Sequence, residues 1–408
     1  MDGKCCIILI FFVSILGSNV NCINKAEIVF QMDKVDYDWN NDSHKQMAID
    51  SNEYIVENNL ITGIKVYGSN VYVTVPRWRR GVPATLNVLV PGNTGTPLLK
   101  PFPSWDMNKI GNCNAFQYVQ SMEIDPNTGY MWIIDLGRIN IRDPVSKPLN
   151  LCPPKLIILD LRTNQIVRHY DFPDEVVSHS SNFMNDIVLD YVNGHARYAY
   201  ISDTSDAKLY VYDFDNNNSY HFQHETMKAQ PLLLGQEDLI AAPIDGIAMS
   251  ADFKFLFYST LTDLRLFAVC TSILRNKHSI FSNNVTMLGR KMGGSDGMVC
   301  SQNSLFYAAF EQHAVAKVTI PKNGMVDFST ENTVVSNATS VIWVDTFGFN
   351  GTDLWFVANK LNYFFQSRMN FSSGEPNMFI WKVNVNEAGY LNRAMERTYY
   401  PSHPGILG

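Results

Sequence analysis

The chain has 408 residues, of which 32 are Lys or Arg and 39 are Asp or Glu, so its formal net charge is −7 at pH 7. This mildly acidic balance argues against a nucleic-acid partner. Beyond the N-terminal region no stretch has the ~18 consecutive apolar residues of a membrane helix, so we expect no membrane partner. The length exceeds that of an average domain, but β-architectures often reach it as one domain.

The first 22 residues have the features of a secretory signal peptide. Lys4 gives a positive start, residues 7–16 are an apolar run interrupted by one Ser, and residues 17–19 end that run. Val20 and Cys22 place small residues at the −3 and −1 positions of a cleavage site. We expect a signal peptide over 1–22 and a secreted, extracellular domain over 23–408. An N-terminal membrane anchor is the alternative, for which the apolar run is short.

The cysteines predict disulfides. Three of the seven fall within residues 1–22, which leaves an even number in the exported part. An even number in an oxidising compartment favours two bridges, and four cysteines allow three pairings. We expect Cys113–Cys152 and Cys270–Cys300, because each pair joins neighbouring repeats. Buried free thiols are the alternative.

Six N-x-S/T sequons agree with export, because this motif is the acceptor for N-glycosylation. They begin at Asn41, Asn217, Asn284, Asn337, Asn350 and Asn370. Asn350 lies in an expected tight turn.

A strand-turn-strand unit recurs along the chain. Its second strand is an aromatic and β-branched run, a composition that favours strands. These runs cover residues 71–77, 131–135, 198–203, 255–259, 305–309 and 354–359. They lie roughly 50 to 65 residues apart, the period of a propeller or a similar array.

Further strands surround each of these runs. Third strands are expected over 85–89, 155–159, 208–212, 265–269, 316–320 and 378–383, and outer strands over 166–170 and 220–223. Radial packing around a channel hides the faces and edges of such sheets. We therefore expect an all-β fold, a single-domain six-bladed β-propeller, with residues 27–30 closing the ring against the last blade. Two β-sandwich domains are the alternative, although no linker divides the chain.

The inner strands predict a polar ring at one mouth of the channel. Aligning these strands by their hydrophobic residues places six polar residues at one height. They are Thr62, Gln120, Asp186, Asp245, Asp296 and Asp345. Acidic groups that converge on a cavity attract a cation, either an amine ligand or a metal ion. In the structural alternative these side chains bond to backbone N–H groups where the chain enters each inner strand.

Signals for catalysis are weak. The sequence contains no H-E-x-x-H, no G-x-S-x-G nucleophile elbow and no phosphate loop. No catalytic residue can be assigned, and we expect no cofactor and no dedicated metal-binding motif. Arg77, Arg79 and Arg80 flank Trp78 after a strand. They could bind a carboxylate or form a solvated loop.

Several motifs resemble those of the insect yellow and major royal jelly proteins. They are residues 75–86 (VPRWRRGVPATL), 98–105 (LLKPFPSW), 131–137 (MWIIDLG), 152–156 (CPPKL), 245–250 (DGIAMS) and 354–361 (LWFVANKL). The resemblance implies a six-bladed propeller, secretion and N-glycosylation. Among these proteins some are tied to cuticle pigmentation and some to dopachrome conversion. Salivary relatives bind biogenic amines, and royal jelly members are food and structural proteins.

The resemblance also suggests ligand-binding positions. Amine-binding relatives use a polar residue and an Asn in the last blade, with an aromatic residue two positions after the Asn. Asn359 matches the Asn, whereas Leu361 and Val344 occupy the aromatic and polar positions. We expect a protein that binds or acts on melanin-pathway indoles or catecholamines, with a dopachrome isomerase-like activity if it is an enzyme. A non-catalytic binder of a small aromatic amine or indole, and a structural or nutrient glycoprotein, are the alternatives.

Overall fold

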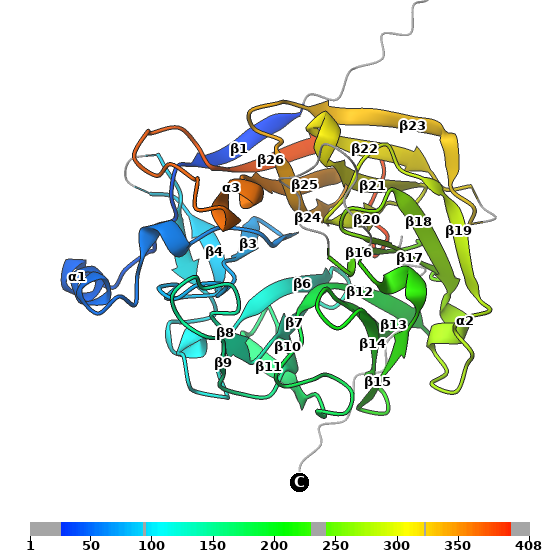
Figure 1. The fold of residues 1–408 in the computed structure, drawn as a ribbon, viewed down its shortest axis with the longest axis horizontal. Coiled ribbons are helices and arrows are strands. Elements are labelled where there is room, and N and C mark those ends of the chain that lie inside the picture. The colour runs from blue at the N-terminus through cyan, green and yellow to red at the C-terminus, as the bar shows by residue number, and fades with distance from the viewer. Residues whose placement is uncertain (1–25, 93–94, 230–241, 322–323, 393–408) are drawn as a thin grey trace, which may run out of the picture.

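The computed structural model describes residues 26–92, 95–229, 242–321 and 324–392, so the predicted signal peptide at 1–22 lies outside the described residues. Six four-stranded sheets stand around a central channel (Figure 1). Their innermost strands contact one another in order around the axis. The predicted all-β six-bladed propeller is confirmed.

The first three blades follow one another directly along the chain. Blade 1 contains β2 (Ile64–Tyr67), β3 (Asn70–Thr74), β4 (Leu86–Val90) and β5 (Leu98–Pro101). Blade 2 contains β6 (Val119–Asp125), β7 (Tyr130–Asp135), β10 (Lys155–Asp160) and β11 (Gln165–Asp171). Blade 3 contains β12 (Met184–Val192), β13 (His195–Asp203), β14 (Lys208–Asp213) and β15 (Asn218–Gln223).

The other blades complete the ring. Blade 4 contains β16 (Ile244–Met249), β17 (Phe255–Thr260), β18 (Arg265–Cys270) and β19 (Val285–Arg290). Blade 5 contains β20 (Met298–Cys300), β21 (Ser304–Ala309), β22 (Ala314–Thr319) and β23 (Asp327–Ser336). Blade 6 contains β24 (Trp343–Asn350), β25 (Asp353–Asn359), β26 (Met378–Asn384) and β1 (Glu27–Met32).

Blade 6 closes the ring by joining the two ends of the described chain. Its three inner strands come from the C-terminal side, and β1 pairs antiparallel with β26 as the outermost strand. Glu27 lies opposite Lys382, and their side chains form an ion pair of 2.6 Å. The predicted closure by residues 27–30 is confirmed.

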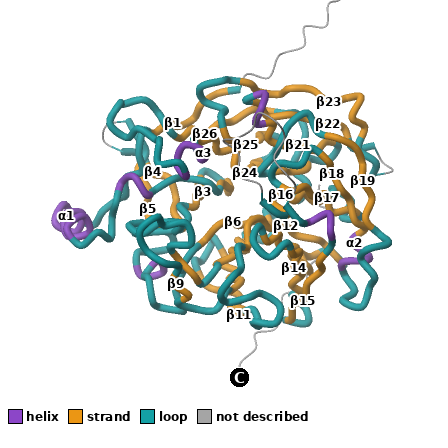
Figure 2. Tube along the Cα trace, in the orientation of Figure 1, coloured by secondary structure: helices purple, strands orange, loops and turns teal. Residues whose placement is uncertain are grey.

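Helices are short and lie between strands or at the periphery (Figure 2). They are α1 (Asp42–Asp50), α2 (Thr271–Leu274) and α3 (Leu361–Phe365), with single 3-10 turns at Val56–Asn58, Asp106–Asn108, Glu225–Met227 and Phe310–Gln312. The hydrophobic pattern did not predict α1, because α1 projects from the disc and buries Ala48 alone among its residues. Asn41 begins this helix by accepting a hydrogen bond from the backbone N–H of His44. A small two-stranded sheet, β8 (Arg138–Ile139) with β9 (Leu149–Asn150), lies outside the blades.

Adjacent inner strands approach one another very closely at the axis. A Cβ on Gly246 would lie 2.0 Å from the carbonyl oxygen of Asp296, and a Cβ on Gly297 would lie 2.3 Å from that of Asp345. Any larger residue at these two positions would push neighbouring blades apart. Glycine at these positions therefore lets the inner strands close around a narrow channel.

One of the two predicted disulfides forms. Cys113 and Cys152 are bonded, which confirms that pairing. The predicted Cys270–Cys300 bridge is wrong, because both thiols are free. Cys270 ends the third strand of blade 4 and is exposed, whereas Cys300 ends the innermost strand of blade 5 and is buried. Adjacent blades thus hold the two residues at different distances from the axis.

Thiol labelling of the native and unfolded protein tests this assignment. Iodoacetamide should modify Cys270 in the native protein, since this thiol is exposed. Cys300 should react only after unfolding, and Cys113 and Cys152 only after reduction. Peptide mapping by mass spectrometry separates the sites. Protection of Cys270 in the unfolded, unreduced protein would contradict the assignment.

Candidate functional site

One mouth of the channel, which we call the upper mouth, is surrounded by one residue from each inner strand. Strand pairing shows which residues are equivalent: Ile124 pairs with Met131 in blade 2, and Phe349 pairs with Leu354 in blade 6. The position four residues earlier is occupied by Thr62, Gln120, Asn185, Asp245, Asp296 and Asp345. In blades 2, 3, 4 and 6 this residue lies within a β-bulge, an irregularity that re-aims side chains.

Asp186 does not belong to this ring, and the sequence alignment of blade 3 was wrong by one residue. Ile124 pairs with Met131 in blade 2, and the pair at the same register in blade 3 is Leu189 with Ala199. Leu189, and not Asp190, is therefore equivalent to Ile124. Asn185 therefore takes the ring position. Asp186 lies one level deeper, where it accepts hydrogen bonds from Ser121 Oγ (3.2 Å) and from the N–H of Ile187 (2.9 Å).

Asp245, Asp296 and Asp345 form a carboxyl cluster on three successive blades, and each is at least nine-tenths buried. Their described partners are side chains. Asn185 Nδ2 donates to Asp245 at 2.8 Å, Trp343 Nε1 donates to Asp296 at 2.8 Å, and Asn359 Nδ2 donates to Asp345 at 3.2 Å. This pattern differs from the structural alternative, in which the backbone N–H groups of the entering chain would hold these carboxylates.

Burial raises the pKa of all three carboxyls. The pKa of Asp245 rises to about 7, and the charges of Asp345 and Asp186 add to the effect of burial. The pKa values of Asp296 and Asp345 are raised well above the ordinary range by burial and by the neighbouring carboxyl, Asp245 and Asp296 respectively. Carboxyl groups that are buried together cannot all ionise, so the cluster holds protons at neutral pH unless a cation replaces them.

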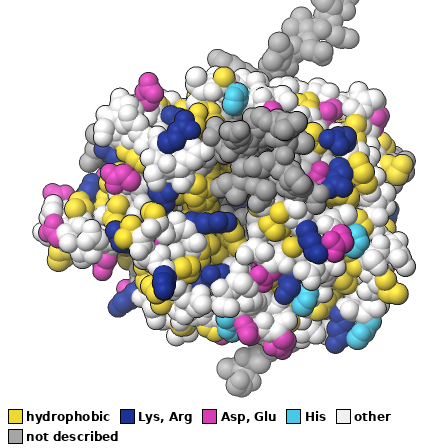
Figure 3. Space-filling view, in the orientation of Figure 1, with side chains coloured by type: hydrophobic (Ala, Val, Ile, Leu, Met, Phe, Trp, Pro, Cys, Tyr) yellow, Lys and Arg dark blue, Asp and Glu magenta, His cyan; other side chains and the backbone are white. Residues whose placement is uncertain are grey.

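Aromatic side chains line a cavity above the carboxyl cluster, which we call the rim cavity; the free space of about 470 Å³ at this mouth is partly open to solvent. Its apolar lining includes Trp78, Phe183, Trp343, Leu361 and Phe365. Trp343 is held by stacking on Phe310 with ring centroids 4.1 Å apart, and Trp78 packs edge-on against Phe365 at 5.0 Å. The polar lining is completed by Gln120, Asn185, Thr204 and Arg142. Figure 3 shows hydrophobic side chains and several Lys and Arg side chains on this face of the molecule.

The residues suggested by family resemblance occupy supporting positions. Asn359 donates to Asp345 and to the carbonyl of Ile61, and its Oδ1 accepts from the N–H of Leu361. All of its polar atoms are engaged, so it orients Asp345. Leu361 lines the rim cavity, whereas Val344 is buried and is not part of the lining.

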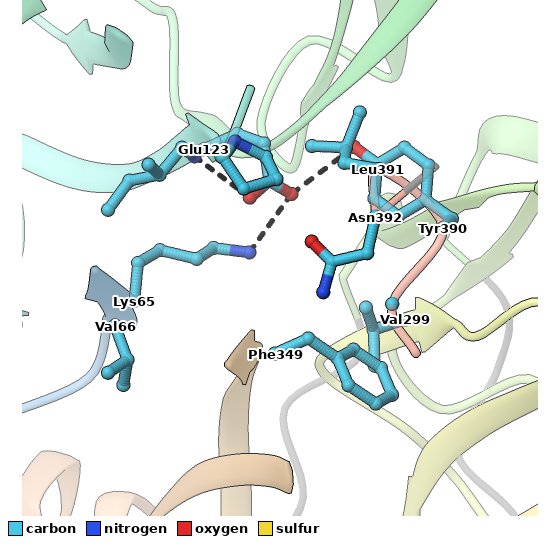
Figure 4. Close-up of a pocket in the computed structure, with 11 residues that line it drawn as sticks. Lys65, Val66, Glu123, Val299, Phe349, Tyr390, Leu391 and Asn392 are labelled. Atoms are coloured by element: carbon cyan, nitrogen blue, oxygen red, sulfur yellow. Dashed lines mark hydrogen bonds and ion pairs between the residues drawn. The ribbon is translucent and has the colours of Figure 1, made fainter. Parts of the chain in front are cut away.

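The opposite mouth of the channel, which we call the lower mouth, is formed by charged residues that the sequence analysis did not single out. Lys65 Nζ lies 3.1 Å from Glu123 Oε2, and both side chains are over nine-tenths buried. Tyr390 donates to Glu123 at 3.3 Å and accepts from the N–H of Leu189. Figure 4 shows Lys65 pointing at Glu123, with Tyr390 and Asn392 beside them. The usable signal was a charged residue between two apolar neighbours in an inner strand, at Lys65 and at Glu123.

The C-terminal residues of the described chain cross this lower mouth. The N–H of Tyr390 donates to the carbonyl of Cys300, and Gly389 forms an isolated bridge with Ser301. Glu387 accepts from Ser301, Ser304 and Lys317. These contacts hold the segment against blade 5 and place Tyr390 at the channel axis.

The arginine run after β3 is structural. Arg77 is buried and donates to five backbone carbonyls, those of Val82, Pro83, Asn108, Phe116 and Gln117. Arg79 stacks over Phe364 at 4.3 Å and donates to its carbonyl. Arg77 and Arg79 therefore serve neither as a carboxylate site nor as a solvated loop.

Two negative findings apply to the described residues alone. No group of three or more His, Cys, Asp or Glu side chains within 26–92, 95–229, 242–321 and 324–392 is arranged to hold a metal ion. No helix in that part of the chain is long and apolar enough to cross a membrane.

The sequence of the chain is similar to those of known proteins. The sequence pattern of the family described as Major royal jelly protein (MRJP) matches residues 118–392. Protein yellow of Drosophila melanogaster is 31% identical over 269 residues, and Protein yellow of Drosophila yakuba is 30% identical over 269 residues. Each alignment covers 62% of this chain and 49% of the relative, so the chain spans about half the length of the curated relatives it matches. The solved structure titled as a luciferin-regenerating enzyme has a TM-score of 0.48 at 14% identity and covers 83% of this chain and 96% of its own.

The pH dependence of stability tests the state of the carboxyl cluster. An unfolded Asp has a pKa of about 3.9, whereas folded Asp245 has a pKa of about 7. The folded state thus binds more protons between these values, and this group lowers the free energy of unfolding as the pH rises from about 4 to 7. Asp245→Asn should remove this loss. In urea titrations, the free energy of unfolding of the variant should rise relative to that of the wild type by on the order of 2–4 kcal/mol between pH 4 and pH 7.

Asp106→Asn provides the control, because Asp106 is exposed. Its pH profile should match that of the wild type. Parallel profiles for Asp245→Asn and the wild type would show that Asp245 ionises normally in the folded protein.

Proposed function

The chain belongs to the major royal jelly protein family, and from that premise we propose that it is a secreted protein that binds a small cationic aromatic ligand in the rim cavity. The ligand class is the amines and indoles of the melanin pathway. Support for export comes from the Cys113–Cys152 disulfide and from the six sequon asparagines, which are all exposed. Support for the ligand class comes from the cavity and from the resemblance to yellow proteins.

The observation that carries the proposal is the position of three buried carboxyls at the floor of a cavity with aromatic walls. A ligand ammonium placed at Asp245, Asp296 and Asp345 would replace the protons that these groups hold and would donate charge-assisted hydrogen bonds to their carboxylates. Its ring would pack against Trp78, Trp343 and Phe365. Each aromatic pair of this kind contributes about 0.5–1.5 kcal/mol beyond the area it buries.

Proton transfer on the bound ligand is the second candidate, favoured by the pKa of Asp245 near 7. A general base works best when its pKa is close to the operating pH. Isomerisation of dopachrome moves one proton from a ring carbon to a ring oxygen and needs no redox cofactor. Asp245 is the residue that would accept the proton from carbon.

Calorimetric titration with tryptamine at pH 7 tests the binding proposal. The wild type should bind, and the double variant Asp245→Asn/Asp345→Asn should bind about 10- to 100-fold more weakly, because two charge-assisted bonds are lost. Following dopachrome decay with the same proteins tests the second candidate, which requires faster decay with the wild type than with the variant.

Matched controls separate binding from folding. Asp106→Asn should bind tryptamine as the wild type does, and circular dichroism should show that the double variant keeps its sheets. Equal affinity in a folded double variant would refute the amine site. Absence of binding by the wild type would favour a structural or nutrient role.

A further inference from the structure

Resting on the proposed function, we infer that the ligand carries a carboxylate as well as an amine, and that Arg142 binds this carboxylate. The ligand class is then the aromatic α-amino acids and their cyclised derivatives, in preference to decarboxylated amines. Arg142 becomes the residue that determines this specificity. The inference rests on the position of Arg142 in the wall of the rim cavity, on its unused donors and on the charges it faces.

The backbone of Arg142 is fixed relative to the cavity. Its N–H donates to the carbonyl of Trp78 at 2.9 Å, and the N–H of Asn140 donates to the carbonyl of Arg77 at 2.8 Å. Trp78 lines the same cavity, and Arg77 is anchored by its five carbonyl partners. These backbone hydrogen bonds hold the loop after β8 against a well-anchored part of the molecule. The backbone position of Arg142 at the rim is therefore fixed.

The guanidinium of Arg142 has no hydrogen-bond or ion-pair partner among the described residues. The adjacent carboxylate, Asp143, is occupied by the backbone N–H groups of Arg80, Val145 and Ser146. The neighbouring Arg138 differs, because its Nη1 donates to the carbonyl of Asn182 at 3.0 Å. Arg142 is exposed, so its N–H donors are hydrated in the free protein, and at the wall of the cavity they can pair with a ligand carboxylate in a bidentate arrangement.

The charges of Arg142 and of the carboxyl cluster both act on Tyr118. Tyr118 is buried and donates to Gln120 of the ring at 3.1 Å. Burial raises the pKa of Tyr118 well above its ordinary range; the charge of Arg142 opposes this rise, and the charge of Asp345 adds to it. Both charges thus act on one hydroxyl next to the ring. A cationic group and an anionic cluster that both act on one hydroxyl fit the paired charges of a zwitterion.

The opposite charges of Arg142 and the carboxyl cluster would let the site discriminate between ligands. A decarboxylated amine would satisfy the carboxyl cluster and leave Arg142 facing the ligand without an acceptor. A carboxylic acid without an amine would pair with Arg142 and would leave the carboxyl cluster without a cation. Only a ligand with both groups pairs with both Arg142 and the carboxyl cluster, and an aromatic ring in addition packs against Trp78 and Phe365.

Paired titrations with L-tryptophan and tryptamine at pH 7 test the inference, since the two molecules differ only in the carboxylate. The wild type should bind L-tryptophan at least about ten-fold more tightly, as expected for a charged hydrogen-bonded pair. Arg142→Gln should abolish this difference by weakening L-tryptophan binding, while tryptamine affinity stays within about two-fold. Arg290→Gln, an exposed arginine on β19, is the matched control and should preserve the difference.

The outcomes separate this inference from the proposed function. If the wild type binds tryptamine but gains nothing from the carboxylate, the role of Arg142 is refuted and the amine site stands. If Arg142→Gln weakens both ligands equally, Arg142 supports the cavity and does not determine specificity, which also overturns the inference. If neither ligand binds to the wild type, the proposed function itself fails.

Discussion

The close approach of the inner strands at the axis is the constraint on which the rest of this structure depends. Gly246 and Gly297 have no side chain because the carbonyls of Asp296 and Asp345 occupy that space. Hydroxyls from the second strands fix other ring carbonyls, as Ser202 Oγ does by donating to Asp245 at 2.6 Å. The backbone geometry that closes the propeller therefore also brings three Asp side chains from successive blades to one mouth.

Gathering these carboxyls has an electrostatic cost that defines what the site can do. Buried like charges hold protons, and the pKa of Asp245 near 7 places that exchange in the physiological range. A cation relieves the repulsion, so the fold creates a preference for cationic ligands before any specific contact is made. The aromatic walls then select for ring size and shape. Deeper in the channel Lys65 partly offsets the acidity, since its charge lowers the pKa of Asp186 against the effect of burial.

The strand pattern of the sequence was sufficient for the fold and for most of the ring. Thr62, Gln120, Asp245, Asp296 and Asp345 were placed correctly because apolar alternation fixes the register of an inner strand. The ring position of blade 3 was predicted wrongly because the register of its long hairpin shifts after Asp190. The sequence pattern therefore did not show that Leu189 is the equivalent residue. The Cys270–Cys300 prediction failed because proximity in sequence says nothing of distance from the axis. Arg142 and Tyr390 come from loops and the C-terminal segment, and loop positions carry no periodic signal.

A crystal structure of the protein grown with L-tryptophan at neutral pH tests the central claim most directly, because it shows where a zwitterionic aromatic ligand sits. The account predicts the ammonium within hydrogen-bond distance of Asp245, Asp296 or Asp345, the ring beside Trp78 and Phe365, and the carboxylate on Arg142. A ligand bound at another surface, with the carboxyl cluster unchanged, would contradict it.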